Sequence, residues 1–363
     1  MLADLQRQWG LAPEALGYIT SAVQLGFIAG TLVFAFFALA DLFSPRIVFF
    51  LCSAAGAIAN AAILALGESF TWLLVMRFAT GFFLAGIYPV GMKIASGWYQ
   101  RDLGNALGFL VGALVVGTAF PHLVKGIGHG LAWQSVLLGV SGVALLGGLL
   151  MLAFVPDGPH LAKAARFDPR ALRAVFRVPA FRASSFGYFG HMWELYAFWA
   201  FVPWALAAHL QNDVPFWSFA VIAAGAIGCV FGGLVSLRLG SAPVAFAQLA
   251  ASGLCCALSP LAFHAPAAPY LAFLLFWGVV VVGDSPQFSA LNAQSAPRER
   301  VGSALTIANC IGFAITIFSI QLLNSLAEIV GPQWLFVLLV PGPLFGLASL
   351  LPVMRRVPGR TAV

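Results

Sequence analysis

The chain has 363 residues, of which 61% are apolar and only 8% are charged, and its formal net charge is +6. A soluble core cannot absorb this much apolar sequence, because a globular domain must also cover its surface with polar residues. The composition therefore excludes a soluble protein, and the lack of short alternating segments in the sequence excludes an outer-membrane barrel.

Eleven segments are long and apolar enough to be membrane-spanning helices, each of which needs roughly 20 apolar residues. They are predicted at Ala15–Ala40, Ile47–Leu66, Phe70–Ile94, Leu103–Val124, Leu131–Val155, Ala183–Ala208, Phe216–Leu237, Pro243–Phe263, Pro269–Leu291, Val301–Leu326 and Trp334–Val353. We therefore expect an all-α polytopic protein embedded in a lipid bilayer. All five cysteines lie inside these segments at no metal-ligand spacing, and we expect them to pack as small hydrophobic residues.

A charged turn follows the first predicted span, in the sequence Ala38-Leu39-Ala40-Asp41-Leu42-Phe43-Ser44-Pro45-Arg46. An acid and a base at adjacent helix ends can favour one conformation through ion pairs and helix dipoles, so Asp41 and Arg46 are candidates for a conformational gate. The alternative is an ordinary charged turn. The stretch resembles the cytoplasmic loop motif of the major facilitator superfamily, although Ser44-Pro45 replaces the usual glycine at the turn. In that family the loop lies between the second and third helices.

The third predicted span contains Arg77 and, one turn later, Gly81. This spacing resembles a second motif of the same superfamily, in its fourth helix. An arginine within a span is energetically unfavourable, which makes Arg77 a functional candidate unless its side chain reaches the headgroups at the outer end. Tyr88 and Pro89 follow, and a proline that frees a backbone carbonyl inside a membrane is typical of helices that line a cavity.

The longest hydrophilic stretch runs from Pro156 to Arg182 and contains six of the eighteen Lys and Arg residues. Its second half predicts a short helix on a membrane surface, capped by Asp168 and Pro169, with Leu172, Val175 and Phe176 on one face. The alternative is a solvated basic loop. Either way, the stretch divides the chain into an N-terminal bundle of five spans (1–155), a cytoplasmic linker (156–182) and a C-terminal bundle of six spans (183–363).

The remaining positive charge gathers in alternate loops, on the side of the linker. The positive-inside rule explains this distribution, so the net charge does not indicate a nucleic-acid partner. The rule places the linker and the C-terminus in the cytoplasm and predicts a plasma (inner) membrane protein. An eleven-span chain then has its N-terminus outside.

Two carboxylates lie inside predicted spans. Glu194 is near the middle of the sixth span, and His191, three residues earlier, is expected to share its helical face. Burial favours the neutral form of a carboxyl group and histidine titrates near neutrality, so the two side chains could together bind and release a proton. The alternative is a neutral Glu194 that is hydrogen-bonded for packing.

Asp284 lies in the ninth span, directly before Ser285-Pro286-Gln287. An acid beside a proline break resembles a site for an ion or a substrate near the middle of the membrane, with Gln287 beside it. A structural pair with a basic residue such as Arg298 is the alternative. Gln24, Asn309 and Gln321 add neutral polar groups that could contact a substrate or hydrogen-bond neighbouring helices.

The two halves of the chain resemble each other loosely, since similar sequences begin at Arg101 and Arg300 and each follows a span that contains a proline. This is the organisation that the superfamily implies, with two bundles of six helices. We therefore predict a secondary transporter that moves a small molecule by alternating access, coupled to protons and acting as a monomer. The two carboxylates leave open a cationic or zwitterionic substrate.

No phosphate loop or other nucleotide motif is present in the sequence, so no cofactor is expected. A membrane sensor that does not transport is a second hypothesis. An intramembrane enzyme is a third, and it is disfavoured because Asp41 lies in a loop and Gly283-Asp284 lacks the longer pattern of aspartyl proteases.

The predicted spans are offset by one helix from the superfamily pattern. The linker follows five spans instead of six, and the Asp41 turn follows the first span instead of the second. The stretch Met1–Gly10 resembles the outer end of a first helix and its following loop. We therefore predict that the reading frame extends upstream by roughly 20 or more mostly apolar residues.

Overall fold

The computed structural model describes residues 2–12, 14–65, 67–99, 103–127, 131–161, 171–210, 212–297 and 300–354. Within these ranges every regular element is a helix, which confirms the predicted all-α class. The elements are α1 (Leu2–Trp9), α2 (Ala15–Phe36), α3 (Leu39–Leu42), α4 (Pro45–Ala61), η1 (Ala62–Leu64), α5 (Phe70–Leu84), α6 (Tyr88–Trp98), α7 (Leu103–Ile127), α8 (Trp133–Phe154), α9 (Ala171–Val175), α10 (Pro179–His209), α11 (Val214–Leu239), α12 (Ser241–Phe263), α13 (Ala267–Gly283), α14 (Ser285–Ser295), α15 (Val301–Val330), η3 (Leu335–Leu339) and α16 (Pro341–Met354).

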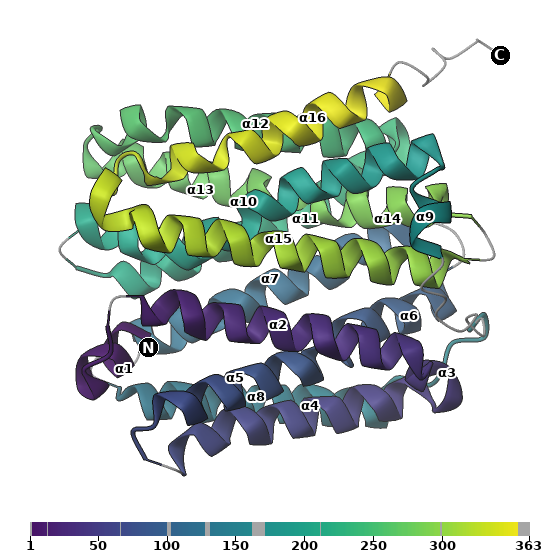
Figure 1. Ribbon diagram of the computed structural model, residues 1–363, viewed down its shortest axis with the longest axis horizontal. Helices are drawn as coiled ribbons and strands as arrows, with labels where there is room; N and C mark the ends of the chain where they lie inside the picture. The colour runs from purple at the N-terminus through teal and green to yellow at the C-terminus, as the bar shows by residue number, and fades with distance from the viewer. Residues whose placement is uncertain are drawn as a thin grey trace.

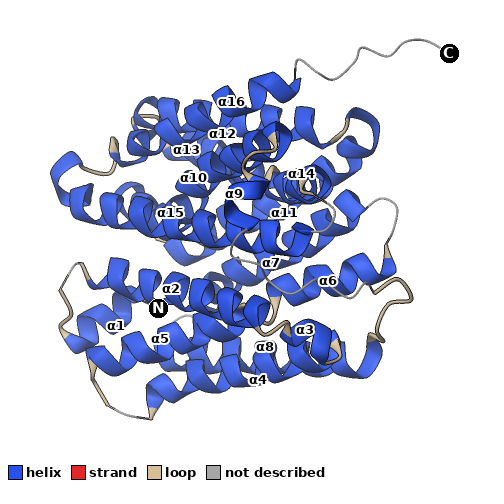
Figure 2. Cartoon of the chain, turned by 45° about the vertical axis from the view of Figure 1, so that its right-hand side comes forward, coloured by secondary structure: helices blue, strands red, loops and turns tan. Residues whose placement is uncertain are grey.

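The long helices form two bundles that lie one above the other in Figure 1. The first bundle contains α2 and α4 to α8, and the second contains α10 to α16, a division that is also visible from the side in Figure 2. Two helix pairs make most of the contacts between the bundles, since α2 packs against α15 and α7 packs against α11, while α7 also touches α14. We call the surface formed by these four helices the seam.

Among the described residues, ten helical segments are long and apolar enough to cross a membrane, and each matches a predicted span to within a few residues. They are Ala15–Phe36, Pro45–Leu64, Phe70–Trp98, Gly104–Ile127, Trp133–Phe154, Val214–Leu239, Ser241–Phe263, Ala267–Ser295, Val301–Val330 and Leu335–Pro352. The prediction at Ala183–Ala208 falls within α10, which has 31 residues but is not among the ten. The interior of α10 contains His191 and Glu194 and many aromatic residues, which make it less apolar than its neighbours.

Two of the membrane spans are interrupted near a proline, as the sequence predicted. One break separates α5 from α6 just before Pro89, and the other separates α13 from α14 at Asp284, two residues before Pro286. A proline has no N–H for the carbonyl four residues back, and its ring clashes with that carbonyl. The helix therefore ends and restarts at both places.

A reciprocal pair of glycines brings α2 and α5 into backbone contact. A Cβ atom added to Gly26 would lie 2.0 Å from the carbonyl oxygen of Phe78, and one added to Gly81 would lie 2.0 Å from that of Val23. Only glycine fits at such a separation, because helices pack this closely only through residues without side chains.

The second bundle repeats this arrangement between α11 and α13. A Cβ atom on Gly228 would lie 1.8 Å from the carbonyl oxygen of Val279, and one on Gly278 would lie 2.0 Å from that of Val221. The corresponding helices of the two bundles are thus held together in the same way, which is expected when the halves of the chain repeat one structure.

The short helix α9 packs against α10 and α15 of the second bundle. Val175 is fully buried in a cluster with Phe181 and with Ala304, Ile307 and Ala308 of α15, whereas Leu172 is half exposed. The prediction of an apolar face turned to a membrane surface is therefore wrong for Val175, because the ends of α10 and α15 cover it. The predicted cap at Asp168 and Pro169 lies outside the described residues.

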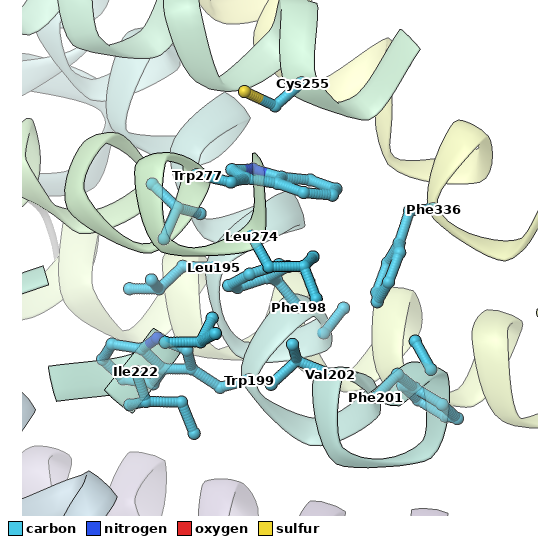
Figure 3. Packing of buried hydrophobic residues seen from close by; sticks show 14 of the residues in the cluster. Leu195, Phe198, Trp199, Phe201, Val202, Ile222, Cys255, Leu274, Trp277 and Phe336 are labelled. Atoms are coloured by element: carbon cyan, nitrogen blue, oxygen red, sulfur yellow. The ribbon is translucent and has the colours of Figure 1, made fainter. Parts of the chain in front are cut away.

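The largest apolar cluster lies mainly in the second bundle and extends to α7, and Figure 3 shows part of it. Trp277 of α13 lies over Phe198 of α10, with 4.5 Å between the ring centroids, and Phe336 meets its edge at 5.2 Å. Aromatic contacts of this kind are energetically favourable and restrict the orientation of each ring. The core therefore fixes the position of the Trp277 indole N–H, which faces a buried carboxylate described below.

Candidate functional site

A small cavity lies between the two bundles, and both contribute to its walls. Its volume is about 30 Å³, which is room for about two water molecules. The lining residues are Tyr88, Val111, Leu114, Tyr188, Met192, Leu195, Tyr196, Trp199, Val282, Ser285 and Phe313, and none of them carries a charge. Of the site residues predicted from the sequence, only Tyr88 belongs to this lining.

The helix α10 turns one face to the cavity and another into its own bundle. Tyr188, Met192, Tyr196 and Trp199 recur at the spacing of one helical face and line the cavity. At about 100° per residue, Glu194 lies about 140° from the centre of that face. The carboxylate therefore points into the second bundle, behind the cavity wall.

Glu194 is held by two side chains from neighbouring helices. It is 1% exposed, and it accepts hydrogen bonds from Ser252 Oγ of α12 and from Trp277 Nε1 of α13, the latter at 3.1 Å. Trp277 Nε1 also lies 3.0 Å from Ser252 Oγ, so the three polar groups form one closed cluster. A buried carboxyl group needs such partners, because an unpaired one is energetically costly in an apolar interior.

His191 pairs with Asp284 and not with Glu194. Its Nδ1 atom lies 2.8 Å from Oδ1 of Asp284, and both side chains are 1% exposed. Residues three apart on a helix differ by about 60° in direction, and the break between α13 and α14 places Asp284 on the His191 side. The predicted partnership of His191 with Glu194 is thus replaced by two neighbouring clusters, one around each carboxylate.

Several buried polar atoms near Asp284 have no well-aligned hydrogen-bond partner among the described residues. They include His191 Nε2, Oδ2 of Asp284, and the oxygen and nitrogen of the Gln287 amide. The side-chain oxygen of Gln248 is also unpartnered, and it lies against Gly283, next to Asp284. Unpaired groups of this kind are rare in native proteins and mark sites of functional interest. The predicted pairing of Asp284 with Arg298 concerns a residue outside the described ranges.

Arg77 contributes to a different network, inside the first bundle. Its guanidinium donates to Oδ1 of Asn60 at 3.3 Å, and the Asn60 amide donates to Ser141 Oγ and to the carbonyl of Leu137 in α8. Arg77 thus links α5 to α4 and α8 and does not line the cavity. Of the other predicted polar residues, Gln24 is buried on α2 and Asn309 is partly buried on α15, and neither belongs to the cavity lining.

The charged turn after α2 is joined to α6 by an ion pair that the sequence did not reveal. Lys93 donates to Asp41 and also to the carbonyl of Ala40 at 2.7 Å. Ser44 of the same turn donates to Asp157 at the start of the linker, at 2.7 Å. Arg46 was predicted to act with Asp41, but its Nε atom has no hydrogen-bond partner in the part of the chain that the structure describes.

Sequence reasoning missed Ser252, Trp277 and Gln248 near the buried carboxylates, and Lys93 at the charged turn. It also missed every residue of the cavity lining except Tyr88. Serine and tryptophan are ordinary in membrane helices, so nothing local marks Ser252 or Trp277 as partners of Glu194. Lys93 could have been found, because an acid at one helix end attracts a base from a neighbouring helix.

The comparisons with known proteins agree with this architecture. The model of the Major Facilitator Superfamily matches residues 1–320. Among solved structures, the human organic anion transporter MFSD10 (TETRAN) is similar, with a TM-score of 0.68 and 16% sequence identity over 95% of this chain and 87% of that one. No protein with a curated description matches the sequence. At this identity the structural likeness concerns the fold alone, but the family model covers most of the chain, which belongs to the Major Facilitator Superfamily.

Proposed function

We propose that the protein is a proton-coupled secondary transporter that moves a small solute by alternating access. The observation that carries this proposal is the pairing of an uncharged cavity between the bundles with buried ionisable groups directly behind its wall. A membrane sensor without transport has no specific observation in its favour.

The size of the cavity supports a mechanism with more than one conformation. At about 30 Å³ it cannot hold an organic solute, so the bundles must separate at the seam before a substrate can enter. Contacts between α2 and α15 would have to open, including the hydrogen bond from Gln321 to Ser21 at 2.8 Å and the ring contact of Phe27 with Phe313, whose centroids are 4.2 Å apart.

The two carboxylate clusters support coupling to protons. An isolated charge in the middle of a membrane is unfavourable, so ionisable residues there are paired or bind ions. Glu194 is neutral when it carries a proton, and the His191–Asp284 pair is neutral when His191 carries one. Each cluster can therefore exist in a protonated and a deprotonated state, as a coupling site requires.

The distribution of charged loops supports an orientation in the plasma (inner) membrane with the C-terminus in the cytoplasm. In this orientation residues 156–182 form a cytoplasmic linker between an N-terminal bundle (1–155) and a C-terminal bundle (183–363). The pseudo-repeat encloses its cavity within one chain, so we expect the monomer to be the transporting unit.

The test is transport by the purified protein in liposomes that contain a pH-sensitive dye. Pools of small metabolites are added outside, and we expect at least one pool to change the internal pH in protein-containing liposomes but not in empty ones. A substrate that accumulates without proton movement and regardless of the pH gradient would rule out the coupling. If no pool causes either uptake or proton movement, transport itself is rejected.

A further prediction concerns the ion pair of the charged turn. We expect Asp41→Asn to lower the transport rate about two- to fivefold while substrate affinity changes little, because the pair joins two helix ends and neither residue lines the cavity. The double variant Asp41→Lys with Lys93→Asp should recover part of the rate. Initial rates and equilibrium binding of the same substrate measure the two effects.

The matched control is Asp213→Asn, because Asp213 is exposed in the loop before α11 and has the left-handed backbone conformation that asparagine tolerates. It should leave both quantities unchanged. If Asp41→Asn instead lost much of its substrate affinity while its turnover stayed normal, Asp41 would belong to the binding site. The hypothesis that Asp41 acts as a conformational gate would then be contradicted.

A further inference from the structure

We infer that the substrate of this transporter is an uncharged organic molecule that presents an aromatic or other flat apolar face and at least one hydrogen-bond acceptor. The inference rests on the proposed transport function and deepens it. It differs from what the name of the similar MFSD10 structure says of that protein, which is an organic anion transporter.

The first argument is the position of the charges in the core. The charged side chains of Arg77 and Glu194 do not line the cavity: Arg77 contacts Asn60, and Glu194 contacts Ser252 and Trp277. Asp284 is directly next to the lining residue Ser285, but its own side chain pairs with His191. A charged substrate would enter a place with no opposite charge in its walls, which disfavours binding.

The second argument is the chemistry of the lining itself. Tyr88, Tyr188 and Tyr196 converge on the cavity from both bundles, together with Trp199 and Phe313. Aromatic walls favour flat apolar surfaces through stacked and edge-on contacts. Phenol hydroxyl groups can both donate and accept hydrogen bonds, so they orient a polar neutral group without requiring a charge.

The third argument is an unpartnered donor in the cavity wall. Trp199 is 6% exposed and lines the cavity, yet its indole Nε1 has no hydrogen-bond acceptor among the described residues. An indole nitrogen can only donate, and a buried tryptophan normally finds an acceptor. A carbonyl, ether or hydroxyl oxygen on the substrate would satisfy it.

The test compares probes that have the same shape and different charge. Benzamide, benzoate and benzamidinium form one set, and the corresponding naphthalene compounds form a second. Binding to the purified full-length protein in lipid nanodiscs is measured at one pH and ionic strength. We expect the amide of at least one set to bind at least about tenfold more tightly than both charged members of that set.

Two variants separate the role of Trp199 from a general effect on folding. Trp199→Phe keeps an aromatic ring but removes the donor, and it should weaken amide binding about three- to tenfold. Trp334→Phe makes the same change at a residue that is 54% exposed and outside the cavity, and it should have no effect. Equal amide binding by Trp199→Phe and the native protein would overturn the assignment of the acceptor.

A charged probe that binds as tightly as its amide, or failure of all six probes to bind, would overturn the inference. Neither result would contradict proton-coupled transport, which the liposome assay tests independently. A second readout comes from the membrane potential: one proton moved with an uncharged substrate carries one net charge. Once the pH-sensitive dye has shown one proton moving with the substrate, a potassium gradient with valinomycin should therefore change accumulation about tenfold per roughly 60 mV. Accumulation that ignores the potential under those conditions would also contradict the inference.

Discussion

Glu194→Gln is expected to abolish proton-driven accumulation of substrate and to leave substrate exchange intact. Glutamine has the shape of the protonated acid, and its oxygen can still accept the hydrogen bonds from Ser252 and Trp277. It cannot bind or release a proton near neutral pH. The accumulation ratio under an imposed pH gradient should fall to about one, whereas exchange of labelled for unlabelled substrate should stay within about threefold of the native rate.

The control for this variant is Glu328→Gln, which makes the same substitution at an exposed residue near the end of α15. It should transport like the native protein. Accumulation by Glu194→Gln at the native rate would exclude Glu194 from coupling and would leave the His191–Asp284 pair as the remaining candidate. Loss of exchange as well as accumulation would instead indicate that the carboxylate has a structural role.

A valine at Gly81 or Gly228 is expected to prevent correct assembly of the bundle in which it lies. The new Cβ atom would lie 2.0 Å from the carbonyl oxygen of Val23 in one case and 1.8 Å from that of Val279 in the other. Both obstacles are helix backbone, so the clash cannot be relieved by rotation of a side chain. We expect a loss of more than about 3 kcal/mol in stability, beyond the usual effect of overpacking.

The measurement is the yield of monodisperse protein and the midpoint of its thermal unfolding in detergent. Gly142→Val is the matched control, because Gly142 is exposed on α8 and an added Cβ atom there meets nothing within 4 Å. It should behave like the native protein. If both core variants unfolded at the same temperature as the native protein, the helices could move apart without loss of stability. The glycine contacts would then not be needed for stability.

The sequence predicted the helices well because each membrane span requires a long apolar segment, which is visible in the sequence. Pro89 and Pro286 likewise revealed the two helix breaks, since the effect of a proline on its own helix is local. The helix predicted at Ala183–Ala208 was also found, within α10, even though His191 and Glu194 make that segment less apolar.

The pairing of the buried polar residues could not be predicted from spacing along one helix. His191 and Glu194 are three residues apart and roughly co-facial, but different neighbouring helices cover the two side chains. The partner of each side chain is set by contacts between helices that are distant in the sequence. Glu194 and Ser252 are 58 positions apart, and His191 and Asp284 are 93 positions apart. The ion pair of Asp41 with Lys93, 52 positions apart, has the same origin.

The reciprocal glycine pairs also have a genetic consequence. Every missense change of a glycine codon introduces a Cβ atom, and at Gly26, Gly81, Gly228 and Gly278 that atom would overlap a main-chain oxygen of the facing helix. Even alanine, the smallest replacement, is excluded. We therefore expect these four codons to accept synonymous changes only, so that a saturation library selected for function would keep glycine at all four while neighbouring lipid-facing positions vary freely.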